Sequence, residues 1–129
     1  MAVIRIETRD GCTVFQPGEE VSGTVRWRLD PPPRSVEARL FWFTEGTGER
    51  DVGVVESVSF ADPGPEDERP FRFQLPGGPY SFSGKIIRLH WAIEVVAEPR
   101  DQAERLGIIM SPSGREIVLP TESKGAGTR

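Results

Sequence analysis

Apolar residues recur at every second position through most of this sequence, and this alternation predicts a protein built from β-strands. The longest example is residues 84–98, where every odd position from 87 onward is apolar and the even positions include Arg88, His90 and Glu94. Successive side chains of a strand point to opposite faces, so the pattern predicts a strand with one buried face. At ~3.3 Å per residue this segment would extend about 50 Å, and we therefore expect a bend or a bulge along it.

Residues 2–7, 20–29 and 71–75 show the same alternation. The positions predicted to face inward there are Ala2, Ile4, Ile6, Val21, Gly23, Val25, Trp27, Leu29, Phe71, Phe73 and Leu75. Gly23 stands in the middle of its strand, at a point where a side chain would obstruct close packing.

Two further segments, residues 35–44 and 50–61, are predicted to form a hairpin around the glycine-containing segment 45–49. A five-residue loop would place Trp42 opposite Val52, Leu40 opposite Val54 and Val36 opposite Val58. A four-residue loop would instead place Arg39 opposite Glu56. A slip of one residue turns every side chain to the other face, and the sequence leaves both registers open.

Proline- and glycine-rich breaks separate the alternating segments. Residues 30–34, with three consecutive prolines, are predicted to be an extended turn, and residues 62–69 a solvated loop. Residues 111–114 form a turn sequence between two short apolar runs, and residues 98–105 are the only segment that could hold a helical turn.

Eight to nine strands without a long helix predict an all-β fold, a two-sheet antiparallel β-sandwich of the immunoglobulin-like type. The unequal strand lengths favour a sandwich over a small barrel. We expect one domain, residues 1–120, followed by a disordered tail, residues 121–129, in which Ala126 is the only apolar residue.

Composition limits the classes of partner. The formal net charge of −4 argues against nucleic acid, because phosphate binding needs a concentrated positive surface. Cys12 is the only cysteine, so no intrachain disulfide can form, which fits a reducing compartment. No apolar run could span a bilayer and the N-terminus lacks the features of a signal peptide. A cytoplasmic, soluble, unprocessed protein is therefore expected, and the scarcity of lysine (Lys85 and Lys124 only) is typical of GC-rich bacterial genomes.

Three motifs occur in the order found in one lobe of the arrestin-like fold. Residues 15–25 hold an aromatic residue, then Pro17-Gly18-Glu19 and a Val-x-Gly-x-Val pattern. Residues 70–76 contain Phe-x-Phe-x-Leu-Pro, and residues 79–84 read Pro-Tyr-Ser-Phe-Ser-Gly before the long alternating strand. Across about residues 15–95 the sequence resembles this family.

The resemblance implies a sandwich lobe with a scaffolding or adaptor role. Arrestins and their relatives, which include the retromer subunit and bacterial sporulation-control proteins, usually have two such lobes, whereas this chain has room for one. The buried charged network and the regulatory tail of visual arrestins match no positions here. No receptor-binding residue is therefore carried over.

Residues suited to catalysis are few. His90, the only histidine, lies on the polar face of the longest predicted strand and is interpreted as an exposed surface residue, because a general base needs a cleft and a nucleophile. Cys12 follows the turn at Asp10-Gly11 and is interpreted as an ordinary cysteine of the kind that is commonly buried.

Acidic and glycine-rich clusters are interpreted as solvated loops. Glu66-Asp67-Glu68 and the set Glu45, Glu49 and Asp51 lack the spacing of a calcium loop. Zinc would need more histidine or cysteine ligands, and no glycine pair opens a strand–loop–helix unit. No catalytic, cofactor-binding or metal-binding residue is therefore predicted, no cofactor is expected, and the chain is predicted not to be an enzyme.

The segment Leu40-Phe41-Trp42-Phe43 supplies the one candidate partner surface. If Leu40 and Trp42 face the core, then Phe41 and Phe43 face outward. There they are either covered by a bulge or by the C-terminal segment, or they form an apolar patch for a partner or a second copy. We therefore predict a protein-binding or scaffold module that uses this face or a sheet edge. A carbohydrate-binding sandwich and a structural protein that self-associates through an edge strand are the alternatives.

Overall fold

The computed structural model describes residues 2–46, 50–83, 87–99, 102–113 and 117–118. These residues form ten strands and one 3₁₀ turn, η1 (Arg9–Gly11). The strands are β1 (Val3–Thr8), β2 (Val14–Phe15), β3 (Glu20–Arg28), β4 (Ser35–Gly46), β5 (Val52–Phe60), β6 (Glu66–Gln74), β7 (Phe82–Ser83), β8 (Ile87–Glu98), β9 (Gln102–Met110) and β10 (Ile117–Val118). The all-β prediction is confirmed, and the total exceeds eight or nine because β2, β7 and β10 are two-residue strands. The predicted tail lies outside the described residues.

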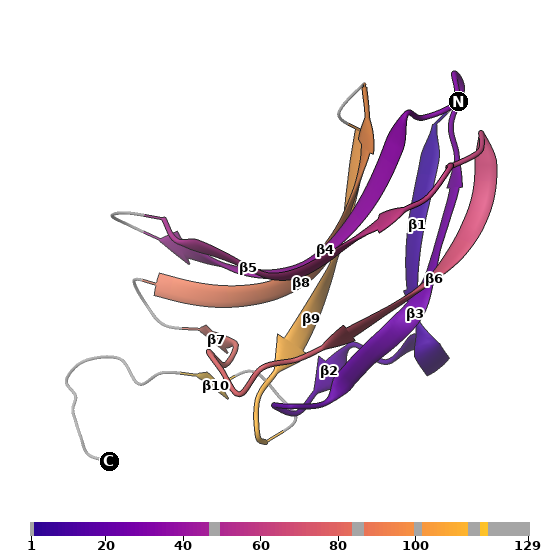
Figure 1. Ribbon diagram of the computed structural model, residues 1–129. Helices are drawn as coiled ribbons and strands as arrows, with labels where there is room; N and C mark the ends of the chain where they lie inside the picture. The colour runs from indigo at the N-terminus through magenta and orange to yellow at the C-terminus, as the bar shows by residue number, and fades with distance from the viewer. Residues whose placement is uncertain (1, 47–49, 84–86, 100–101, 114–116, 119–129) are drawn as a thin grey trace, which may run out of the picture.

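The strands form two facing sheets (Figure 1). The small sheet has the order β1-β3-β6, and the large sheet has the order β10-β7-β8-β4-β5, with β9 added beside β8 and β2 beside β9. One edge of β8 pairs with β4 along its whole length, while β7 and β9 share the other edge. All of the longer pairs are antiparallel, whereas β2–β9 and β7–β10 are short parallel pairs. The predicted sandwich is confirmed.

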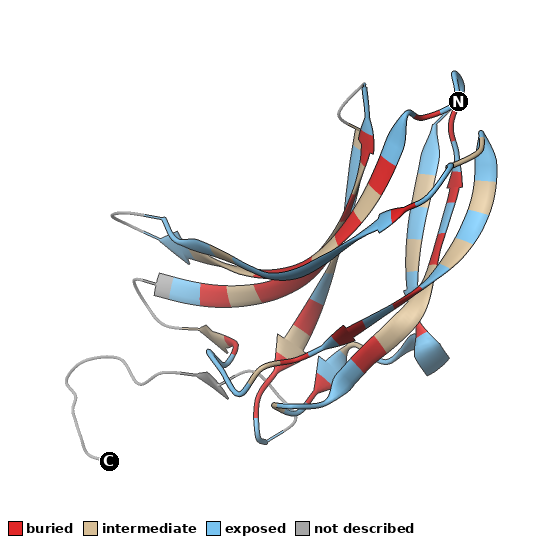
Figure 2. Ribbon diagram, in the orientation of Figure 1, coloured by how far each residue is buried: buried red, intermediate tan, exposed pale blue. Residues whose placement is uncertain are grey.

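The core lies between the sheets and follows the alternation of the sequence. Its largest fully buried side chains include Trp27, Trp91, Phe73 and Leu40. Buried bands alternate with more exposed ones along the strands in Figure 2. The inward set predicted for β3 and β6 is buried apart from Gly23, while Ile4 and Ile6 on the edge strand β1 are half-buried against the core. Ala2 is exposed.

The longest predicted strand bends, as expected, and the bulge lies in a different strand pair (Figure 1). β8 keeps one unbroken register with β4 from Ile87 to Glu98, and it curves without a bulge (Figure 1). The irregularity lies between β4 and β5, where Leu40 pairs with Glu56 and Phe41 pairs with Val54. Val55 is therefore the extra residue of a β-bulge.

Because of this bulge, neither predicted hairpin register holds along the whole hairpin. The four-residue-loop register fits the tip, where Trp42 pairs with Gly53, but beyond the bulge Arg39 lies opposite Ser57 and not Glu56. The tip register has a steric cause. A Cβ at position 53 would lie 2.3 Å from the Trp42 indole, so the indole can lie across the strand only where the opposing residue is glycine.

The segment expected to be a loop, residues 62–69, is half strand, because β6 begins at Glu66. This part of β6 pairs with β3 from Arg26 to Arg28, and cross-strand contacts of Glu66 with Arg28 at 3.0 Å and of Glu68 with Arg26 at 3.3 Å accompany the pairing. Between them, hydrogen bonds to the Asp67 carboxylate, first from the Arg69 side chain and then from the Glu68 backbone, lower the pKa of Asp67 from its ordinary value of 3.8.

The helical turn considered for residues 98–105 is not found in the described part of that segment, residues 98–99 and 102–105. β8 ends at Glu98, and β9 begins at Gln102 and runs back antiparallel to it. This pairing allows β9 to bury Ile108 and Met110 in the core, and such tertiary burial outweighs local helix preference.

Candidate functional site

The outer face of the large sheet, turned away from the core, carries the two predicted surface residues. Leu40 is fully buried between the sheets and Trp42 packs partly against the same core. Because side chains alternate along β4, Phe41 and Phe43 lie on the opposite, outer face. Their rings stack on one another with centroids 5.7 Å apart. The outward direction of the pair follows from β4 itself and does not depend on the hairpin register.

Arg105 of β9 covers this aromatic pair. Its guanidinium carbon lies 4.9 Å from the centroid of the Phe41 ring and 5.0 Å from that of Phe43, within the range of a cation–π contact. One terminal nitrogen also contacts Glu94 at 3.3 Å. Phe41 is consequently only 5% exposed, whereas Phe43 is half-buried.

Small residues on β8 and β9 make this cover possible. Phe41, Ala92 and Gly107 are neighbours in register across β4, β8 and β9. Strands lie about 4.8 Å apart, so the Arg105 side chain must extend over β8 to reach the Phe41 ring. A methyl group at position 92 leaves room for this path, and Ala92 is buried although it lies outside the inter-sheet core.

Two valines of β5 extend the apolar surface beyond the rings. Val54 pairs with Phe41 and Val52 pairs with Phe43, so both valines share the outer face. They are 56% and 63% exposed, and β5 is drawn almost entirely as exposed in Figure 2. We call Val52, Val54, Phe41 and Phe43 the outer apolar patch.

Sequence reasoning found the two aromatic residues of this site and missed Arg105 and the valines. Arg105 could have been placed near the aromatic pair from its position opposite Glu94 in an antiparallel pair. A helical turn over residues 98–105 is incompatible with that pairing. The valines can be placed only once the bulge in β5 is known.

His90 lies beside the patch and is less exposed than predicted. Its side chain is 31% exposed, its Nε2 lies 3.0 Å from a carboxylate oxygen of Glu45, and its ring centroid lies 5.1 Å from that of Phe43. The neighbouring aromatic ring and carboxylate account for the partial burial.

Replacing His90 with alanine is expected to change the free energy of unfolding by about 1 kcal/mol or less, the net contribution of a typical hydrogen bond. Thermal melting of the His90→Ala variant beside the wild-type chain would measure this. A loss of several kcal/mol would instead identify His90 as a structural anchor of the face.

Cys12 is exposed rather than buried. It follows η1, where the backbone turns through positive φ angles at Asp10 and Gly11, and its thiol donates a hydrogen bond to the Val14 carbonyl oxygen at 3.2 Å. This turn at the end of β1 directs the side chain away from the core.

The carboxylates do not assemble into a metal site within the described part of the chain. No group of three or more His, Cys, Asp or Glu residues there is placed to hold a metal ion. Glu49, one of the predicted loop acids, lies outside the described residues.

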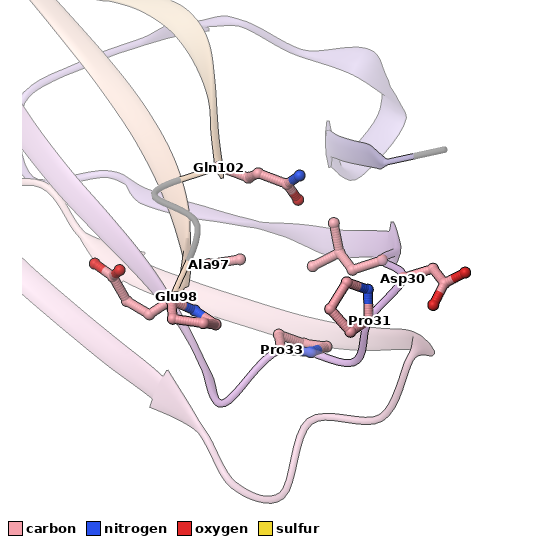
Figure 3. A pocket seen from close by; sticks show the side chains of 8 residues that line it. Asp30, Pro31, Pro33, Ala97, Glu98 and Gln102 are labelled. Atoms are coloured by element: carbon pink, nitrogen blue, oxygen red, sulfur yellow. The ribbon is translucent and has the colours of Figure 1, made fainter.

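A small pocket at one end of the sandwich, where the loop after β3 meets the end of β8 and the start of β9, has a volume of about 10 Å³. This is enough for one water molecule at most. Figure 3 shows the Asp30 and Glu98 carboxylates at its opposite sides, pointing away from each other.

The fold is similar to that of Spo0M, a sporulation control protein from Bacillus subtilis, with a TM-score of 0.63 and 22% sequence identity over 85% of this chain. The match covers 49% of the Spo0M chain, so this chain spans about half its length. Spo0M has an arrestin-like fold, and the predicted arrestin-like fold is thereby confirmed. No protein-family model and no curated protein matches the sequence.

Two other solved structures are less similar. A DNA-bound alkylpurine DNA glycosylase, AlkC from Pseudomonas fluorescens, gives a TM-score of 0.46 at 10% identity, covering 85% of this chain and 30% of that one. A β-glucosidase from Listeria innocua gives 0.47 at 10% identity, covering 92% and 17%. Likenesses this weak carry no functional argument. Within the residues described, the structure contains no helix long and apolar enough to cross a membrane.

Proposed function

We propose that this protein is a non-enzymatic, adaptor-type module that binds a protein partner on the outer face of its large sheet. The arrestin-like fold shared with a sporulation control protein supports a regulatory role of this general kind. The observation that carries the proposal is the outer apolar patch, in which two exposed valines adjoin stacked aromatic rings and a half-exposed arginine. Aromatic and arginine side chains dominate the energetics of protein interfaces.

The face is a better candidate than the sheet edge. β5 lies at the edge of the large sheet, where a partner strand could in principle be added. The bulge at Val55, however, breaks the regular alternation of side chains along β5. Val54 shares the outer face with Phe41, whereas Glu56, two positions later, lies opposite the inward Leu40. Bulges of this kind interrupt the hydrogen-bonding ladder and protect sheet edges from pairing.

The same geometry disfavours the carbohydrate-binding alternative. A sugar-binding sandwich presents an open aromatic ring, whereas Phe41 is covered by Arg105. We further infer a cytoplasmic location, which the single free cysteine supports.

The proposal predicts that three serine substitutions on the patch, Phe43→Ser, Val52→Ser and Val54→Ser, abolish partner binding while the domain stays folded. Phe41 is left intact because its ring is buried. A photo-crosslinking amino acid placed at Phe43 of the otherwise unaltered chain, expressed in the native cells, should form a covalent adduct with one protein. The amount of that protein recovered with the triple variant should fall at least tenfold.

A matched control replaces two exposed valines elsewhere, Val3→Ser and Val14→Ser, and should retain the partner. Thermal melting confirms that both variants are folded. A folded triple variant that recovers the same partner at the wild-type level would disprove the proposal, and an adduct with a second copy of this chain would redirect it to self-association.

A further inference from the structure

We infer that the partner segment bound by this face is acidic, an extended stretch of a protein in which carboxylate side chains flank an apolar residue. The inference rests on the proposed function and adds the chemistry of the ligand. Its basis is a shallow groove of about 370 Å³ over the outer apolar patch. The patch residues line this groove, and three arginines, Arg39, Arg50 and Arg105, line it with them.

Two carboxylates, Glu45 and Glu94, also line the groove, and each makes a contact within the chain. Glu94 contacts Arg105 at 3.3 Å and its side chain is only 20% exposed. Glu45 contacts His90 at 3.0 Å. Glu94 is therefore largely withdrawn from a partner, whereas the Glu45 side chain is 59% exposed and can still accept hydrogen bonds.

The three arginines of the groove have N–H donors left over for a ligand. A guanidinium carries five N–H groups. Arg39 uses its Nε toward Glu37 at 3.2 Å, and Arg105 uses one terminal nitrogen toward Glu94. Arg50 is exposed and makes no ion pair with any described residue. The groove is thus lined by three arginines and two carboxylates, an excess of positive charge, although the chain as a whole carries a net charge of −4.

The side chain of Arg105 is also held in place by its neighbours. Stacking on Phe41 and Phe43 and the contact with Glu94 restrict its guanidinium, while 48% of the side chain remains exposed. A planar guanidinium binds a carboxylate through two parallel hydrogen bonds, and one that is already ordered loses less entropy when it binds. The exposed valines of the same groove, Val52 and Val54, supply the complementary site for the flanking apolar side chain.

The experiment selects ligands from a phage-displayed library of random peptides on the wild-type chain. The expected sequences have aspartate or glutamate on either side of a leucine, valine or aromatic residue. A synthetic peptide made from them should bind at least tenfold more weakly to Arg39→Glu/Arg50→Glu. Its binding should also weaken at ionic strengths where the Debye length falls from about 10 Å to about 3 Å.

A control with the same change in net charge reverses Arg5 and Arg9 instead, two exposed arginines remote from this groove. This control should bind the peptide as the wild-type chain does. If Arg39→Glu/Arg50→Glu does not fold, peptide binding is measured with Arg39→Gln/Arg50→Gln, which removes the two positive charges without adding negative ones. Selection of basic or uncharged peptides, no selection at all, or equal loss in the control would each overturn the inference.

The failures of the two proposals can be distinguished. If the selected peptides are not acidic but bind the wild-type chain and not the triple serine variant, the acidic preference is overturned and the proposed function stands. Acidic peptides that bind the triple serine variant unchanged would show that the outer apolar patch is not the site, and would overturn both.

Discussion

Trp91→Ala is expected to lower the free energy of unfolding by about 3–5 kcal/mol, the usual cost of truncating a large aromatic residue in a packed core. The indole is 1% exposed and lies between Trp42 on β4 and Ile108 on β9. Its Nε1 also donates a hydrogen bond to the Pro79 carbonyl oxygen at 2.7 Å, so the truncation removes both packing and a polar contact. Domains typically have only about 5–15 kcal/mol of stability, and the variant should be poorly soluble or partly unfolded.

The Trp91→Phe variant separates the two contributions. Phenylalanine keeps most of the buried ring but leaves the Pro79 carbonyl without its donor, which should cost roughly 1–3 kcal/mol. Urea denaturation followed by circular dichroism would measure both variants. A Trp91→Ala protein with wild-type stability would contradict the placement of this side chain at the centre of the sandwich.

The inward side chains of the fold could be predicted because one physical rule decides them. A strand with a buried face must alternate, and the alternation in β3, β6 and β8 identified Val25, Trp27, Phe73 and Trp91 as core residues, all of them buried. Strand partners are decided differently. The bulge at Val55 depends on how β4 meets β5 in three dimensions, and no local pattern in residues 50–61 marks it.

The same distinction applies to the candidate site. Phe41 and Phe43 were predicted to lie on the outer face because their direction follows from alternation along one strand. The cover over Phe41 comes from Arg105, more than sixty positions later in the chain, and requires the β8–β9 pairing that the sequence did not reveal. Burial of an outward residue by a distant side chain is a tertiary property that periodicity does not contain.

The second change expected to have a large effect is the addition of a single methyl group at Gly23. This glycine was predicted to be needed for packing between the sheets, but the obstacle lies within the small sheet. Gly23 pairs with Thr8 of β1, and a Cβ at this position would lie 2.0 Å from the Glu7 carbonyl oxygen and 2.8 Å from the Thr8 Cα. Both atoms belong to the backbone, so no side-chain rotation can relieve the contact.

Gly23→Ala is therefore expected to cost about 3 kcal/mol, the upper end of the range for overpacked sites, because β1 must move away from β3. Gly107→Ala is the matched control. It is also in mid-strand, but a Cβ added there would meet no atom within 4 Å beyond its own chain neighbours, so alanine should be neutral or slightly stabilising through the lower entropy of the unfolded chain. Thermal melting of the two variants, with hydrogen exchange of the β1 amides, measures the contrast. Equal stabilities would show that β1 can shift at little cost, and that the close approach at Gly23 does not fix the position of this strand.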